Sequence, residues 1–204
     1  MKIAIFGATG MVGSQIAAEA VRRGHEVTAI SRSGGPVPGV PSATPLAADQ
    51  ADAGAVAAVA KTNDAVVLAT GPSRTGADHQ LWLDATATAM ANVGSTRTMV
   101  VGGAGTLLMD GKRLLDLPDF PEAYRAEALT AATALEAIKA LPEDVNWTVM
   151  APAPEIAPGE RTGSYVVGTD SPAGGTISTQ DFALAMLDEL ETPKHVRQRF
   201  TAAN

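Results

Sequence analysis

The chain has 204 residues, of which 46% are hydrophobic and 18% are charged, a composition typical of a compact folded domain rather than of a disordered chain. Its formal net charge of -7 would repel a phosphate backbone and argues against nucleic acid as a partner. The sequence has no cysteine, which excludes disulfides, thiolate metal sites and cysteine nucleophiles.

No segment reaches the ~18 uninterrupted apolar residues that cross a bilayer. The first residues lead directly from a short apolar segment into a glycine-rich loop, which leaves no room for a signal peptide. We therefore expect a soluble, cytoplasmic protein without a membrane partner.

Short apolar segments alternate with longer segments of helical period, which indicates a parallel sheet covered by helices on both faces. Along the chain, the sequence predicts strands near 2–7, 26–31, 64–70, 97–102 and 146–151, with a weaker strand near 44–47. It predicts helices near 11–23, 52–61, 78–93 and 121–141. The expected fold class is α/β, with one doubly wound parallel sheet in a single domain over residues 1–204.

The first predicted helix places its apolar residues at steps of three and four, so that one face packs on the sheet; these are Met11, Val12, Ile16, Ala17, Ala20 and Val21. Gly24 is expected to end this helix as a left-handed cap. The Arg22-Arg23 pair falls in its last turn, where positive charge suits the helix dipole, and no further role is assigned to it.

The last quarter of the chain begins with a segment that is rich in proline and glycine. Regular structure is interrupted by Pro152, Pro154, Pro158 and Gly159, which predicts a loop-rich segment to about residue 176. We interpret this segment as a lid or a substrate-side elaboration. A last helix near 179–191 follows, capped by Ser178 or Thr179 and with Asp181 in its first turn. A strand near 195–202 ends the chain, so residues 152–204 contribute the substrate-side loop, the last helix and the last strand.

The first predicted strand ends in a glycine loop of sequence G-A-T-G-M-V-G, formed by Gly7, Ala8, Thr9, Gly10, Met11, Val12 and Gly13. Gly7 permits the tight strand-to-helix turn, Gly10 lets a pyrophosphate approach the backbone, and Gly13 lets helix and strand pack closely. The amides at the start of the helix then bind the phosphates. A loop between an apolar strand and an amphipathic helix favours a Rossmann-type dinucleotide site over a merely tight turn.

The second predicted strand ends in Ser31, Arg32 and Ser33. Sites specific for NAD carry a carboxylate at this point to bind the ribose hydroxyls, whereas an arginine accommodates the 2′-phosphate of NADP. Because this chain has the arginine and lacks the carboxylate, we expect NADP(H) as the cofactor. The alternative is a solvated loop arginine.

Further loop positions follow the other predicted strands. In an open parallel sheet, ligands bind beyond the carboxyl ends of the strands, so these loops are expected to share one crevice. The candidate cofactor-binding residues here are Asp49, Thr70, Gly71, Pro72, Gly102, Gly103, Ala104, Pro152 and Ala153. For Asp49, ordinary turn chemistry is an equal alternative.

With these motifs assembled, the chain resembles the atypical short-chain dehydrogenase/reductases, specifically the NAD(P)H-binding, NmrA-like group. The resemblance extends over nearly the whole chain, through G-A-T-G-M-V-G, S-R-S, V-V-G-G-A-G-T-L-L, N-W-T-V-M-A-P-A, P-G-E-R-T-G-S-Y and K-H-V-R-Q-R-F-T. It implies a single Rossmann domain that carries NADP(H). It also implies one of two functions, a reductase of small molecules such as flavins and quinones or a regulator that binds dinucleotide without turnover.

One departure from the superfamily concerns its catalytic Tyr-x-x-x-Lys pair. Tyr124 is followed four residues later by Ala128, and Lys139 would lie about 22 Å away along the helix. The serine expected after the fifth strand is replaced by Gly102-Gly103. Tyr124 is the only candidate catalytic residue, against the alternative of a packing or surface tyrosine. Hydride transfer to a flavin or quinone does not need the pair.

Other chemistries find less support. His25, His79 and His195 are scattered and show no metal-ligand spacing, so no metal site is predicted. Trp82 could line a substrate pocket, although helical spacing favours core packing. No serine lies in the G-x-S-x-G turn of hydrolases, and a nucleotide-sugar epimerase would need the missing pair and a larger C-terminal part. An NADPH-dependent oxidoreductase is favoured over a dinucleotide-sensing regulator.

Overall fold

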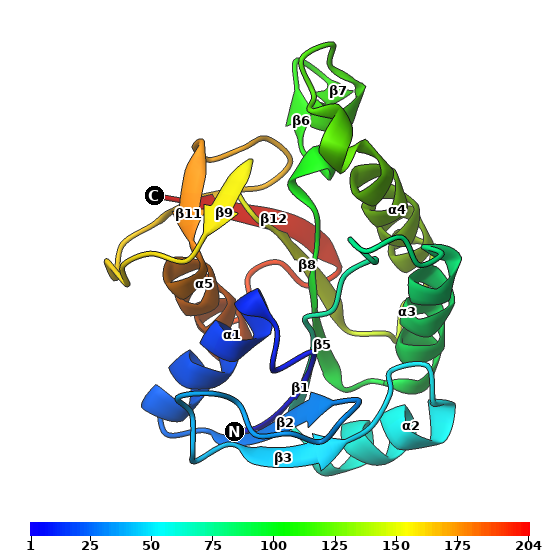
Figure 1. Ribbon diagram of the computed structural model, residues 1–204, viewed down its shortest axis with the longest axis vertical. Helices are drawn as coiled ribbons and strands as arrows, with labels where there is room; N and C mark the ends of the chain where they lie inside the picture. The colour runs from blue at the N-terminus through cyan, green and yellow to red at the C-terminus, as the bar shows by residue number, and fades with distance from the viewer.

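Eight strands form one sheet in the computed structural model, which describes residues 1–204 (Figure 1). The order in the sheet is β10-β12-β8-β5-β4-β1-β2-β3. Seven strands are parallel and β10 is antiparallel to its neighbour β12. The parallel strands are β1 (Lys2–Phe6), β2 (Glu26–Ser31), β3 (Thr44–Ala47), β4 (Ala65–Leu68), β5 (Arg97–Val101), β8 (Trp147–Ala151) and β12 (Gln198–Ala203), and the antiparallel strand is β10 (Val166–Gly168).

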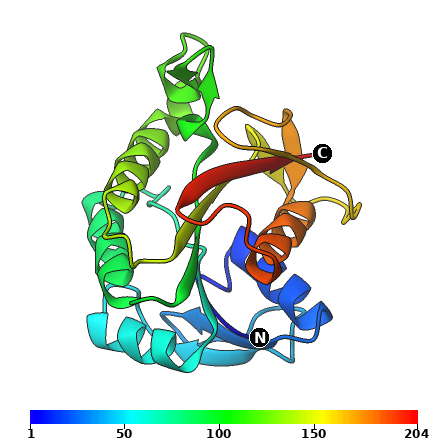
Figure 2. The ribbon, with the colours of Figure 1, turned by 180° about the vertical axis from the view of Figure 1, so that it is seen from behind.

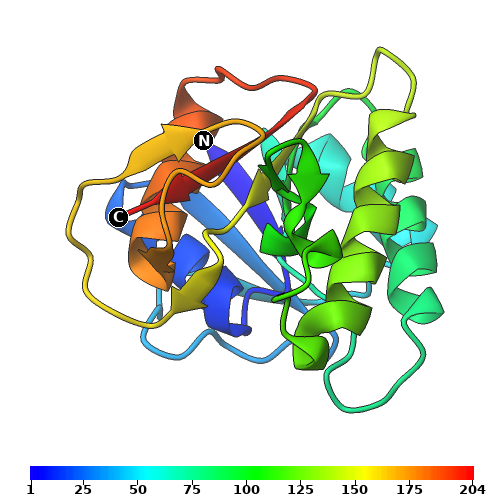
Figure 3. The same cartoon turned by 90° about the horizontal axis from the view of Figure 1, so that it is seen from above.

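Five helices cover the two faces of this sheet. One face carries α1 (Met11–Arg22) and α5 (Thr179–Glu191), and the other carries α2 (Ala53–Thr62), α3 (Gln80–Asn92) and α4 (Glu122–Lys139). The three layers are clearest in Figures 2 and 3. This is the doubly wound Rossmann-type arrangement, and the predicted fold class is confirmed.

The core consists of two apolar layers, one on each side of the sheet. β1 shows why: Ile3 and Ile5 pack with α1 and α5, whereas Ala4 and Phe6 pack in the layer of α2, α3 and α4. Successive side chains of a strand point to opposite faces, so a continuous apolar segment such as Lys2–Phe6 serves both layers at once.

The chain order also fixes where a ligand can bind. From β1 the chain proceeds to β2 and β3 on one side, then crosses back to β4 on the other side. The strand order therefore reverses between β1 and β4, and the loops at the carboxyl ends of these strands leave a crevice at this point. The glycine loop lies at this position.

The smaller elements depart from the sequence expectations. A hairpin of β6 (Leu108–Met109) and β7 (Lys112–Arg113) lies between the short helices η1 (Ala104–Thr106) and η2 (Leu114–Asp116), and projects at the top of Figure 1. The segment predicted as loop-rich contains β9 (Glu155–Ala157), which pairs with β11 (Thr176–Ser178), and the sheet strand β10. These strands of two or three residues are too short to produce a recognisable alternation.

Two further expectations need correction. The helical period predicts Met11 on the apolar face of the first helix, yet Met11 is the first residue of α1 and is 47% exposed. The last strand begins at Gln198 rather than near 195, because Arg197 adopts a left-handed φ of 56°. No helix is long and apolar enough to span a membrane.

Candidate functional site

The glycine loop is shaped by close backbone contacts. Gly7 has a φ of +78°, and a Cβ there would lie 2.6 Å from the carbonyl oxygen of Ala69 after β4. A Cβ on Gly13 would lie 2.1 Å from the carbonyl oxygen of Gly7. Only glycine fits at either position, and the loop is consequently drawn tightly against both β4 and the start of α1.

The backbone amides of this loop fall into two groups. Those of Gly7 and Ala8 donate to the carbonyl of Ile30, and that of Gly10 donates to the carbonyl of Gly7. No acceptor within the protein bonds the amides of Thr9, Met11, Val12 and Gly13. The loop therefore presents a row of free N–H groups at the positive end of a helix, which is a ready anion site.

Two of the other four long helices begin with a side-chain cap, whereas α3 and α4, like α1, do not. The start of α2 is capped by the Asp52 carboxylate, which accepts from the amides of Gly54 and Ala55. The start of α5 is capped by the Ser178 hydroxyl. By contrast, Gly10 occupies the cap position of α1 and has no side chain to offer. The first turn of α1 thus lacks the internal partners that the first turns of α2 and α5 have.

The loop after β2 places Arg32 beside this crevice. Ser31 accepts a hydrogen bond from the amide of Gly34 at 3.1 Å, and its hydroxyl lies 3.4 Å from that of Ser33. These contacts hold the turn, while the exposed Arg32 guanidinium has no hydrogen bond or ion pair with the protein. The arginine is free to meet a ligand.

The loops after β3 and β4 are joined by a polar network. The Thr70 hydroxyl donates to the side-chain oxygen of Gln50 at 2.8 Å and accepts from the indole N–H of Trp82 at 3.0 Å. The amide nitrogen of Gln50, a buried residue, donates to the Thr86 hydroxyl. Sequence analysis singled out Thr70 and left Gln50 unnoticed, since a lone glutamine carries no motif. Asp49 is exposed and accepts from the amide of Ala51, as a turn residue does.

A histidine fixes the loop that follows Thr70. Gly71 and Pro72 lead into a segment whose Ser73 carbonyl contacts His79 Nε2 at 2.9 Å, and His79 Nδ1 contacts the Thr130 hydroxyl on α4 at 2.8 Å. His79 thus ties this loop and the start of α3 to α4. The structure gives this histidine a positioning contact that its isolated place in the sequence did not suggest.

The glycines after β5 are required by packing. A Cβ on Gly102 would lie 2.7 Å from Val149 Cγ1, and one on Gly103 would lie 2.9 Å from Ala131 Cβ. Ala104 begins η1 and is partly buried. Close approach of β8 and α4 therefore explains both glycines without a ligand. After β8, Pro152 and Ala153 are buried, so their side chains belong to the core and only their backbone could meet a cofactor.

Tyr124 lies on the first turn of α4, at the same edge of the sheet. Its side chain is 55% exposed and its hydroxyl has no partner. Ala128, at the position of the superfamily lysine, is buried beside Leu115 and Phe120. Because that position is filled with apolar packing, no neighbouring cation lies there to assist the tyrosine.

An ionic cluster behind the loop was missed by sequence analysis. The buried Glu19 carboxylate of α1 accepts from Arg22 at 2.6 Å, Arg23 at 2.8 Å and Arg161 at 2.9 Å. Burial raises the pKa of Glu19, but these hydrogen bonds outweigh it and hold the pKa well below its ordinary value. The arginine pair thus has specific carboxylate partners, which corrects its assignment to the helix dipole alone.

The segment 158–165 is attached to both helices of this face. Besides the ion pair of Arg161, Thr162 donates its hydroxyl proton to the Asp181 carboxylate at 2.6 Å, and Tyr165 donates to Asp188 at 2.5 Å. Burial and the bond to Asp188 raise the pKa of Tyr165. Much of the expected lid is therefore bound along α5, as the yellow and orange chain beside α5 in Figure 3 illustrates.

These observations test whether a dinucleotide fits. The free amides of α1 match a pyrophosphate, and the crevice between β1 and β4 matches the place where such ligands lie. A doubly wound sheet with this loop defines a dinucleotide-binding protein of the Rossmann type.

Comparison with known proteins identifies the family. A family model described as NAD(P)H-binding matches residues 7–193, and the chain belongs to this family. The arrangement is consistent with the atypical short-chain dehydrogenase/reductases.

Several relatives match the chain over its whole length. The protein YwnB of Bacillus subtilis (strain 168), itself uncharacterized, is 39% identical, with 100% of this chain and 99% of that protein covered. A Burkholderia pseudomallei structure, provisionally named an exported protein, is 42% identical with a TM-score of 0.87, and both chains are fully covered. SP1627 of Streptococcus pneumoniae TIGR4, provisionally named an NADH-flavin reductase, is 32% identical with a TM-score of 0.87, with 100% of this chain and 99% of that chain covered. The family and these neighbours support an NAD(P)H-dependent reductase that uses a nicotinamide cofactor.

Proposed function

We propose that this protein is an NADPH-dependent oxidoreductase that reduces a small, planar, redox-active acceptor such as a flavin or quinone. The observation that carries the proposal is the row of unpaired amides at the uncapped start of α1, with the unpaired guanidinium of Arg32 across the crevice. The provisional name of SP1627 as a flavin reductase agrees with the class of acceptor.

In this proposal, the amides of Thr9, Met11, Val12 and Gly13 bind the pyrophosphate, and the loop around Arg32 binds the adenosine end. The cofactor, when bound, supplies a hydride from its nicotinamide ring. The remaining proposed contacts come from the same edge of the sheet, through Gly7, Ala8, Gly10, Ser31, Ser33, Asp49, Thr70, Gly71, Pro72, Gly102, Gly103, Ala104, Pro152 and Ala153. Since several of these side chains are buried, their backbone is the proposed contact.

The class of acceptor follows from what the site lacks. Ala128 fills the place of the superfamily lysine with buried apolar packing, and the exposed Tyr124 therefore lacks that partner. An acceptor that needs a proton from the protein is therefore disfavoured. A flavin or quinone takes its proton from water, so the protein need only position the two rings and exclude water between them.

A second candidate function is a dinucleotide sensor, which the same buried Ala128 favours, because binding alone needs no proton donor. A panel of FMN, a short-chain quinone and an aldehyde, each with NADPH and followed at the nicotinamide absorbance, separates the two functions. We expect turnover with FMN or the quinone and none with the aldehyde. NADPH that binds but is oxidised by no acceptor would contradict the enzyme and support the sensor.

The preference for NADPH depends on Arg32. We expect Arg32→Ala to weaken NADPH binding about tenfold, because a charged hydrogen bond to the 2′-phosphate is lost, and to leave NADH binding unchanged. Arg74→Ala is the matched control, because Arg74 is exposed and its ion pair joins it to Glu127 rather than to the crevice. Equal affinities of the wild type for NADPH and NADH would refute the preference and agree with the dinucleotide named for SP1627.

The place of action is also part of the proposal. We propose that the protein acts in the cytoplasm, although the Burkholderia relative carries a name that marks it as exported. Fractionation of cells that produce the natural protein decides between the two locations.

A further inference from the structure

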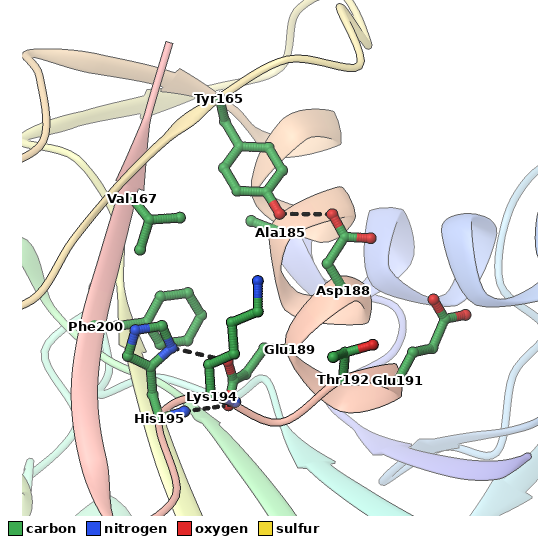
Figure 4. Close-up of a pocket in the computed structure, with 10 residues that line it drawn as sticks. All are labelled: Tyr165, Val167, Ala185, Asp188, Glu189, Glu191, Thr192, Lys194, His195 and Phe200. Atoms are coloured by element: carbon green, nitrogen blue, oxygen red, sulfur yellow. Dashed lines mark hydrogen bonds and ion pairs between the residues drawn. The ribbon is translucent and has the colours of Figure 1, made fainter.

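The last strand of the sheet, β12, has different surroundings on its two faces. Phe200 packs with α5 and lines a cavity of about 290 Å³ (Figure 4). The carboxylates in the walls of this cavity all have arginine partners, namely Asp188 and Glu191 with Arg23, and Glu189 with Arg97. Successive side chains of a strand point to opposite faces, so the residue before Phe200, Arg199, lies on the side of α4. With the carboxylates of the cavity paired, the polar group of β12 without an explained role is Arg199.

Arg199 is a buried arginine that joins three segments of the chain. Its side chain is only 4% exposed. Nη1 donates to the carbonyl of Thr106 in the turn after β5, and Nη2 donates to the carboxylate of Asp170 after β10 at 2.5 Å and to its carbonyl at 3.3 Å. Burial of a guanidinium costs free energy that burial of an apolar side chain does not. An apolar side chain, however, could not bond these two segments to β12.

The Thr106 end of this junction continues to the glycines after β5. Thr106 is the last residue of η1, and its hydroxyl donates to the carbonyl of Gly103 at 2.7 Å. The amide of Leu108, which follows η1, donates to the carbonyl of Asp170 at 2.7 Å. The turn 103–106 is therefore held from β12 and from the loop after β10, in addition to its own hydrogen bonds.

The turn 103–106 lies on the side of the crevice where the proposed reaction would occur. The strands stand in the order β2, β1, β4 and β5, and the turn follows β5. Under the proposed function, Arg32 after β2 binds the adenosine end and the free amides after β1 bind the pyrophosphate. The nicotinamide half then lies on the other side of β1, beyond the carboxyl ends of β4 and β5. The turn is thus placed to form a wall against which the acceptor would lie.

We propose that Arg199 is a positioning residue, which holds the turn 103–106 in place beside the nicotinamide and the acceptor. The inference rests on the proposed oxidoreductase function. Because Arg199 is buried, it touches neither ligand and acts through Thr106. Its loss should slow hydride transfer, which needs close alignment of two rings. Dinucleotide binding, which depends on the loops after β1 and β2, should be unchanged.

The test measures the oxidation of NADPH bound to the full chain in a single turnover, after rapid mixing with FMN or, where FMN is inert, with a short-chain quinone. The amplitude reports how much of the protein is intact, whereas the rate constant reports how well the two rings are aligned. Arg199→Met keeps the length of the side chain and loses its donors. We expect its rate constant to fall about 10- to 100-fold, with a dissociation constant for NADPH within about twofold of the wild-type value.

Two milder variants accompany Arg199→Met, because that change leaves the Thr106 carbonyl without its partner and can reduce the amount of folded protein. Arg199→Lys keeps the charge but reaches one of the two partners rather than both, and its rate constant should lie between those of the wild type and Arg199→Met. Asp170→Ala removes an exposed carboxylate and should lower the rate constant about threefold. Asp119→Ala is the matched control and should change nothing, since Asp119 is exposed and forms no ion pair.

Three outcomes would overturn the role of Arg199 while the proposed function stands. These are an unchanged rate constant in Arg199→Met, a smaller amplitude with the wild-type rate constant in the variants of the junction, or an NADPH affinity that falls as much as the rate constant. Wild-type protein that binds NADPH but transfers hydride to neither acceptor would instead refute the proposed function, and this inference with it.

Discussion

The glycine-loop region and the C-terminal region of this molecule are held together by different forces. Around residues 2–13, the backbone itself makes the contacts: carbonyl oxygens lie where a side chain would otherwise be, and the amides of Gly7 and Ala8 donate to β2. Around 158–204, long charged side chains join segments far apart in the sequence, as Glu19 and Arg161 do across 142 positions.

This difference determines what each region can do. Backbone contacts leave little freedom, which is what a preorganised phosphate site needs. Side-chain contacts at the C-terminal region fix the segment 158–165 against α5. The following substitutions test whether the two regions respond as these forces predict, beginning with the largest expected effect.

Gly13→Ala should be the most damaging substitution. Its Cβ would lie 2.1 Å from the Gly7 carbonyl oxygen, so α1 must move away from β1 at the cost of about 3 kcal/mol or more of unfolding free energy. Urea unfolding measures the loss, and NADPH binding should disappear with it. Gly54→Ala is the control, since a Cβ in this exposed first turn of α2 has ordinary contacts. An unchanged midpoint for Gly13→Ala would show that the loop is not tightly packed.

Glu19→Gln tests the ionic cluster. We expect a loss of about 2–3 kcal/mol at neutral pH, because Arg23 and Arg161 lose a shared buried partner. Glu160→Gln is the matched control, since Glu160 is exposed and forms no ion pair. Limited proteolysis of the segment 158–165 should also accelerate in Glu19→Gln, whereas NADPH binding should be retained. Loss of NADPH binding without loss of stability would contradict the separation of the two regions.

The pH dependence of the free energy of unfolding also tests the ionic cluster around Glu19. Because the pKa of Glu19 is lower in the folded than in the unfolded chain, its contribution is complete above the ordinary value of 4.5 and is lost as the pH falls toward the folded pKa. The free energies of unfolding of the wild type and Glu19→Gln should therefore converge below about pH 4.5. A constant difference between pH 7 and pH 3 would contradict this account.

Gln50→Met should have the smallest of these effects. The thioether matches the volume of the amide but offers Thr70 and Thr86 no comparable partner, and we expect a loss of about 1–2 kcal/mol with weaker NADPH binding. Gln80→Met on the exposed start of α3 is the control. Unchanged stability in Gln50→Met would mean that water replaces the amide and that the network does not position the loops after β3 and β4.

The contrast between backbone contacts in the glycine loop and side-chain contacts in the C-terminal region explains how much of the structure could be predicted from the sequence. The order of strands and helices and the glycine loop follow from local patterns, since Gly7, Gly10 and Gly13 mark a backbone requirement. The burial of Glu19 could not be predicted in this way, because its carboxylate is paired with Arg161, a residue that no local sequence pattern connects to it. Gln50 and the strand β10 were missed for the same reason. The roles of Arg32 and of the other candidate site residues remain predictions.

The central claim is that the free amides at the start of α1 bind a nicotinamide dinucleotide. Calorimetric titration of the wild-type chain with NADPH tests it most directly. The account predicts saturable binding of one dinucleotide per chain, and a weaker isotherm of the same stoichiometry with NADH. No heat of binding with either dinucleotide would contradict the claim.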